Sequence, residues 1–159
     1  MQVMNRVWLI KVNATIYNIL GGAREYGGEI PWHFKDNLQV ASGDKVFFYL
    51  TDSKARVSKN KYSLIDTLFK RFLFKGEILH VYNEIKDYDN VYWNDKDYKS
   101  IIESTNHGYA VIKITQVLYD FKIRSNMVDR RIWDLKYAKE DAYELDSDMV
   151  YSIQRHIPF

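Results

Sequence analysis

The sequence predicts an α+β domain built on a curved mixed β-sheet or small barrel with helices around it. Four or five runs of apolar residues have strand character, and segments with helical periodicity lie between and after them. The 159 residues include 13 Tyr, 8 Phe and 4 Trp, which are residue types that strands favour. This length fits one domain, spanning residues 1–159.

The first elements are a strand and a helix. Residues 7–12, VWLIKV, combine β-branched and aromatic residues, which predicts a strand. Asn13 can cap a helix over residues 14–26, where apolar residues recur at helical spacing. The glycines Gly27 and Gly28 end that helix. We expect the following stretch, with Trp32 beside a proline, to be a loop.

The middle of the chain predicts two strands. Residues 42–44, Ser-Gly-Asp, are typical of a turn, and the apolar run 45–50 that follows predicts a central strand. Asp44 is expected to accept hydrogen bonds from turn amides rather than to act as a catalytic acid. Residues 51–61 are polar and basic, which indicates a loop. Residues 72–82 predict a strand with a bulge at Gly76.

The last third predicts one strand and two helices. Residues 86–104 are polar and look irregular, whereas 109–118 is the clearest late strand. Ser125 or Asn126 can cap one helix, and Ser147 can cap another.

Several enzyme classes lack support in the sequence. There is no cysteine, and the histidines do not have the spacing that puts two imidazoles on one helix face, so we expect neither metal nor cofactor. No nucleophile elbow, P-loop or dinucleotide fingerprint is present. The triplet 84–86, Glu-Ile-Lys, matches only a fragment of a metal-dependent nuclease motif, and 106–107, Asn-His, only a fragment of an HNH motif. We therefore expect no catalytic residue.

The sequence shows neither a predicted membrane span nor a predicted signal peptide. The chain has no apolar run of about 18 residues that would span a membrane. Its N-terminus reads as a strand rather than a signal peptide. We therefore expect a cytoplasmic protein without membrane partners.

Positive charge is concentrated in the first half. Residues 1–76 hold 12 Lys/Arg and 6 Asp/Glu, a net +6, whereas residues 77–159 hold 11 and 15, a net −4. A dense basic set between residues 54 and 75 is either a solvated loop or a surface that follows a nucleic-acid backbone. The phosphate-binding candidates are Lys54, Arg56, Lys59, Lys61, Lys70 and Arg71.

Three segments stand in a characteristic order: WLIKVN at 8–13, SGDKVFFYL at 42–50 and RFLFKGEILHV at 71–81. Their order resembles that of the EVE-type domains of the PUA-like superfamily, which are related to YTH readers. The resemblance covers roughly residues 5–120 and is greatest to the modules at the front of modification-dependent HNH restriction nucleases. It implies a curved sheet with an aromatic cage that takes up a flipped nucleobase.

The resemblance also implies roles for particular residues. Trp32 matches a cage wall, and the alternative is that it plugs one end of the core. Lys11 and Asn13 match a polar loop that reads the base edge. The other cage candidates are Tyr49 on a pocket-lining strand, Trp93 as an opposing wall, and Tyr26, which is left open between cage and core.

The favoured function is therefore a non-catalytic module that captures a modified, for example methylated, base of DNA in modification-dependent restriction. Cleavage would be done by a nuclease partner or another domain. The alternatives are an RNA-binding PUA-like domain, a small magnesium-dependent nuclease using Glu84 and Lys86, and a scaffold whose aromatics are all core or protein interface.

Overall fold

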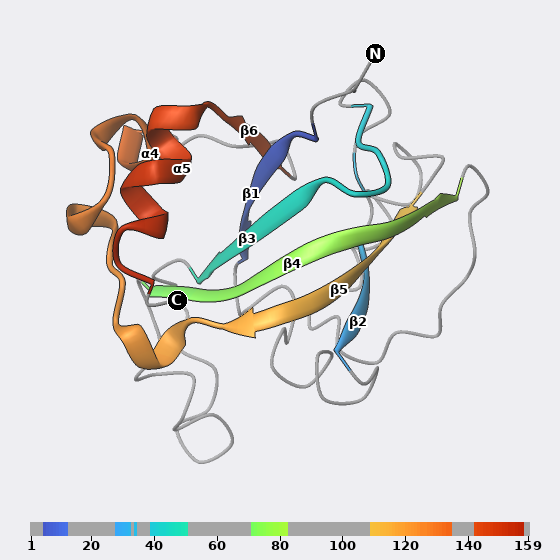
Figure 1. Ribbon diagram of the computed structural model, residues 1–159, viewed down its shortest axis with the longest axis horizontal. Helices are drawn as coiled ribbons and strands as arrows, with labels where there is room; N and C mark the ends of the chain where they lie inside the picture. The colour runs from blue at the N-terminus through green and yellow to red at the C-terminus, as the bar shows by residue number, and fades with distance from the viewer. Residues whose placement is uncertain are drawn as a thin grey trace, which may run out of the picture.

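The computed structural model describes residues 5–12, 28–32, 34, 39–50, 71–82, 109–134 and 142–157. These residues form a mixed six-stranded sheet with short helices at one end, which is the α+β class that the sequence predicts (Figure 1). Across the sheet the strands run β2 (Glu29–Trp32), β5 (Tyr109–Val117), β4 (Arg71–Tyr82), β3 (Lys45–Leu50), β1 (Val7–Val12) and β6 (Tyr143–Leu145).

The pairing explains why the sheet is mixed. The strands β1 and β3 run parallel, and every other neighbouring pair is antiparallel. In the described part of the chain, β2 and β6 each pair on one side only, so the sheet is open and is not a closed barrel. The expected strands at 7–12, 45–50, 72–82 and 109–118 are all present within one residue of their bounds.

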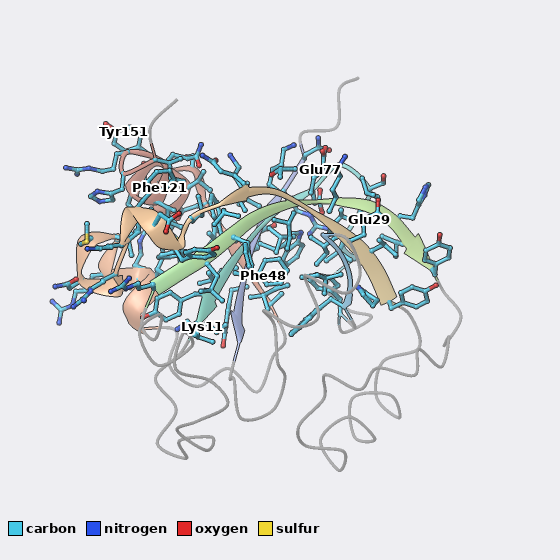
Figure 2. All side chains as sticks on the ribbon, turned by 90° about the horizontal axis from the view of Figure 1, so that it is seen from below. Lys11, Glu29, Phe48, Glu77, Phe121 and Tyr151 are labelled. Atoms are coloured by element: carbon cyan, nitrogen blue, oxygen red, sulfur yellow. The ribbon has the colours of Figure 1, made fainter. Side chains whose placement is uncertain are left out.

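The sheet has two differently covered faces. The inner face carries Phe48 and lies on the concave side of the arch, and the outer face carries Glu77 (Figure 2). The inner cluster includes Trp8, Ile10, Trp32, Phe48, Leu50, Phe74 and Ile112. The outer cluster includes Leu9, Phe47, Tyr49, Phe72, Ile132 and Ile153. Neighbouring strand residues such as Phe47 and Phe48 alternate between these clusters, as strand geometry requires.

Two short helices cover one end of the outer face. They are α4 (Arg130–Asp134) and α5 (Ser147–Gln154), and they contribute Ile132 and Ile153 to the outer cluster. The expected caps were wrong by a few residues. Residues 125–127 form a 3₁₀ turn, η3, and Asp129 precedes α4, accepting a hydrogen bond from the Arg131 amide at 2.9 Å. Asp146, not Ser147, caps α5 by accepting from the Met149 amide at 2.9 Å.

The register of β4 against β5 shifts between Lys75 and Gly76, where the sequence predicts a bulge. The strands approach so closely there that a Cβ on Gly76 would lie 2.8 Å from Ile112 Cγ2 and 2.9 Å from the Lys113 carbonyl oxygen. Only glycine fits this approach without displacing backbone. The bulge therefore depends on Gly76 for steric reasons.

Asp44 fixes the turn that leads into β3. Its buried carboxylate accepts hydrogen bonds from the amides of Arg6 and Ala41, both at 3.0 Å, and from Trp8 Nε1 at 2.9 Å. Both carboxylate oxygens therefore accept from structural donors, which confirms the prediction of a turn role. It also ties the start of β1 to the start of β3.

The expected helix at 14–26, the expected loop at 51–61 and the irregular segment 86–104 lie outside the described residues. Among the helices that are described, none combines the length and the apolar character that a membrane crossing needs.

Candidate nucleic-acid interface

Trp32 lies on strand β2 and not in a loop, which corrects the sequence-based expectation. Glu29–Trp32 pairs antiparallel with β5, so that Trp32 lies opposite Ala110 and Ile30 opposite Ile112. Ile30 and Trp32 share the inner face because they are two residues apart on a strand. Trp32 is 9% exposed, so most of the indole is packed in the inner cluster.

A row of perpendicular aromatic rings extends from Trp32 across the inner face. The Trp32 and Phe48 ring centroids are 6.1 Å apart at 78°. Phe48 contacts Phe74 at 6.4 Å and 79°, and Phe74 contacts Tyr119 of η2 (Tyr119–Phe121) at 6.1 Å and 77°. Each such contact contributes about 0.5–1.5 kcal/mol beyond area burial. The row therefore holds the indole in a fixed orientation.

Tyr49 and Lys11 lie on the opposite face from Trp32. Tyr49 belongs to the outer cluster and contacts Phe72 at a ring distance of 5.1 Å. Lys11 lies opposite Tyr49 in the parallel pairing, so it shares that face. The structure brings Lys11 and Tyr49 together but separates both from Trp32. A single cage containing all three is therefore not formed, and their roles in binding stay predictions.

The Lys11 ammonium is partly desolvated. Lys11 Nζ lies 6.0 Å from the centroid of the Tyr143 ring of β6, and burial lowers the pKa of Lys11 below its usual value. Lys11 is therefore a half-buried cation on β1 whose side chain reaches over the Tyr143 ring of β6.

Most of the other predicted site residues lie outside the described part of the chain. They are the cage candidates Asn13, Tyr26 and Trp93 and the phosphate candidates Lys54, Arg56, Lys59, Lys61 and Lys70. Glu84 and Lys86, the residues of the nuclease alternative, also lie outside it. Within the described residues, no group of three or more His, Asp or Glu side chains could hold a metal ion.

Arg71 is the one phosphate candidate that the structure describes. It is the first residue of β4 and lies opposite Leu50 on one side and Arg124 on the other. Leu50 belongs to the inner cluster, and residues directly opposite on paired strands share a face, so Arg71 is directed to the inner face. Its Nε is buried and has no hydrogen-bond partner among the described residues.

Sequence reasoning missed two surface features. Arg124 follows the η2 turn, and nothing local indicates that the chain returns there to pair with the start of β4. At the other end of β4, Tyr82 stacks on Tyr109 with centroids 4.8 Å apart and planes 15° apart, and Tyr82 is 39% exposed. The pairing of these tyrosines could have been suspected only from the correct β4–β5 register.

The outer face beyond the helices carries a line of alternating charges, called here the outer charge line. It consists of Lys45, Glu77, Lys113 and Glu29 on four adjacent strands, each directly opposite the next. Lys45 Nζ and Glu77 Oε1 are 3.1 Å apart. The line has no net charge, so it offers no electrostatic attraction to a polyanion. The inner face is the better candidate for nucleic acid.

No family model matches the chain, and no curated protein matches it. Solved structures, however, share its fold. A protein of Pseudomonas putida superimposes with a TM-score of 0.53 at 16% identity, covering 94% of this chain and 98% of the other. A protein of Rhodopseudomonas palustris gives a TM-score of 0.52 at 13% identity, covering 95% and 92%. At such identities the similarity establishes the fold alone.

A weaker similarity is to the YTH domain of the Zygosaccharomyces rouxii MRB1 protein, in complex with N6-methyladenosine RNA. Its TM-score is 0.44 at 10% identity, covering 100% of this chain and 92% of the other. A superposition of this quality supports no argument about this chain.

Proposed function

We propose that this chain is a nucleic-acid-binding module that takes up a modified base of DNA on the inner face of its sheet, with Trp32 as one wall. The supporting observation is an indole that packs against Phe48 and has 9% of its surface exposed. Phe48 lies on the concave side of the curved sheet (Figure 2). A pocket wall is buried at its back and open only towards its ligand, so low exposure is compatible with this role.

The chemistry of such a site follows from the aromatic wall. A flipped base stacks on an aromatic face, and stacking contributes on the order of 1–3 kcal/mol per base. A methyl group on the base gains further from leaving water for an apolar enclosure. The module needs no catalytic group for this, and we propose that it binds without cleaving.

The resemblance to EVE-type domains of the PUA-like superfamily supports the same conclusion. It adds the suggestion that the module serves modification-dependent restriction, with cleavage done by a nuclease partner or a further domain. Under this proposal the module supplies recognition only.

Binding to matched oligonucleotides tests the proposal. Fluorescence anisotropy would compare DNA with and without 5-methylcytosine, 5-hydroxymethylcytosine or N6-methyladenine, and each sequence as RNA. We expect at least a tenfold preference for one modified DNA, or about 1.4 kcal/mol. Equal affinity for modified and unmodified strands would refute the proposal. A preference confined to RNA would establish the RNA-binding alternative, and cleavage in magnesium would support the nuclease.

The role of Trp32 is tested with a conservative change. Trp32→Ala would open a cavity costing about 3–5 kcal/mol, so Trp32→Leu is the better variant because it keeps apolar volume in the core. We expect Trp32→Leu to lose most of the preference for the modified base. The matched control is Tyr151→Leu on α5, an aromatic residue that is 69% exposed and separate from the inner cluster. An unchanged preference in Trp32→Leu would exclude Trp32 as a wall.

A further inference from the structure

Arg71 and Arg124 face each other across an isolated antiparallel bridge. The bridge is flanked by a hydrogen bond of 3.0 Å from the Phe72 amide to the Ile123 carbonyl oxygen. That arrangement makes Arg71 and Arg124 a non-hydrogen-bonded pair, the class in which opposing residues approach to a Cα distance of about 4.5 Å. The side chains of Arg71 and Arg124 therefore start from neighbouring Cα atoms on the same face of the sheet.

No negative charge balances this pair in the described part of the chain. The nearest comparison is Arg131, which is held by Asp129 at 2.8 Å and Asp146 at 2.7 Å. Neither Arg71 nor Arg124 has such an ion pair with a described acidic residue. Arg71 also keeps its buried Nε without a described hydrogen-bond partner. Like charges directly opposite each other destabilise a sheet, and a buried donor without a partner adds to that cost.

We propose that Arg71 and Arg124 form a clamp for a phosphate group. Arginine presents a planar fork of N–H donors that binds phosphate oxygens two at a time. One phosphate placed between the two forks would offset the repulsion between the two cations. The clamp therefore explains the facing like charges with one ligand.

The position of the clamp points to a nucleic-acid backbone as the source of the phosphate, and this step rests on the proposed function. Arg71 lies opposite Leu50, two residues along β3 from Phe48, which contacts Trp32. With a rise of about 3.3 Å per strand residue, the clamp is within about 20 Å of the indole. At about 3.4 Å per base step, the gripped phosphate lies at most about six steps from the base at Trp32.

The anion site is tested first with inorganic phosphate alone. Thermal unfolding in phosphate and in chloride at matched ionic strength would be compared for the full chain and for Arg71→Gln and Arg124→Gln. The control is Arg130→Gln, an exposed arginine on α4 without a described acidic partner. We expect phosphate to raise the midpoint of the wild type and of Arg130→Gln but not of the two clamp variants. No phosphate response in the wild type, or the same response in all four proteins, would overturn the clamp.

The nucleotide source is tested with the same proteins and oligonucleotides. Arg124→Gln, which changes an exposed side chain, should weaken modified and unmodified strands alike by about tenfold. It should also reduce the slope of log affinity against log salt by about 0.7–0.9, as for one lost phosphate contact. The ratio of modified to unmodified affinity should not change, in contrast to Trp32→Leu.

The two proposals fail separately. A phosphate response that depends on Arg71 and Arg124, with no oligonucleotide bound by the wild type, would support the clamp with free phosphate as its source and refute the proposed function. Base discrimination that depends on Trp32, with both arginine variants equal to the wild type in every assay, would refute the clamp and leave the proposed function standing.

Discussion

Replacing Asp44 should cost much of the stability of the fold, because this one carboxylate serves three donors. In Asp44→Ala the amides of Arg6 and Ala41 and the indole N–H of Trp8 all lose their acceptor. Hydrogen bonds to a charged group contribute about 1.5–3 kcal/mol each. Contributions within one network do not add, and removing a buried charge relieves some desolvation cost. We therefore expect a loss of about 3–5 kcal/mol.

Asp44→Asn should cost less, about 1–3 kcal/mol. Its amide oxygen can replace Oδ2, which accepts from Trp8 and Ala41, but its NH₂ group then faces the Arg6 amide in place of Oδ1. Urea unfolding followed by tryptophan fluorescence measures both variants, with equal slopes required for the comparison. Asp120→Ala, an exposed change on η2, is the control and should stay within about 0.5 kcal/mol of the wild type. An Asp44→Ala loss below about 1 kcal/mol would refute this account of the turn.

Three further changes test the backbone and the charges. Arg71→Met should raise the free energy of unfolding by about 1 kcal/mol or more in urea, because it removes a buried donor without a described partner, while weakening oligonucleotide binding. Gly76→Ala should cost about 1–3 kcal/mol in the same assay, since the new Cβ meets Ile112 and the β5 backbone. For Lys11, whose pKa is lowered by burial, the folded state binds fewer protons than the unfolded state. Wild-type stability should therefore rise relative to Lys11→Met as the pH approaches the unfolded-state value of about 10.4.

A specific result would contradict each of these three predictions. A less stable Arg71→Met would show that the guanidinium contributes to the folded state without a ligand. Gly28→Ala is the comparison for Gly76, since Gly28 has φ +85° with open space around it and should cost only the conformational penalty of about 1–2 kcal/mol. Gly76→Ala at wild-type stability would mean that β4 and β5 can separate easily. A stability difference between the wild type and Lys11→Met that does not vary with pH would contradict the lowered pKa.

The central strands could be predicted because their apolar runs have few competing interpretations. Residues 45–50 are almost entirely apolar, which fits a strand buried on both faces, and β3 is indeed buried between β1 and β4. Asp44 was also predictable, since an aspartate after glycine at a strand start has backbone donors within reach.

Strand β2 could not be predicted, because glycine and proline concealed it. Pro31 lacks an N–H and normally argues against a strand, but β2 is at the edge of the sheet, where the missing donor is tolerated. The alternation of Ile30 and Trp32 was the available signal, and it covers only one period. The expectation of a loop around Trp32 failed with it.

The residue types of the candidate site could be predicted, but not which of those residues lie together on one face. Basic and aromatic residues are visible in any sequence, but their faces depend on register. Tyr49 and Trp32 were grouped although the pleat puts them on opposite faces. Arg124 was missed because its pairing with Arg71 spans more than 50 residues of chain and follows from tertiary structure.

The outer charge line affects how a partner would approach before any contact is made. At 0.1 M salt the screening length is about 10 Å, and beyond it Lys45, Glu77, Lys113 and Glu29 cancel. If the chain binds nucleic acid as proposed, a strand that diffuses towards the outer charge line gains no attraction from these four residues. Under the same proposal, the neutrality of the line would affect the rate of association more than the strength of binding.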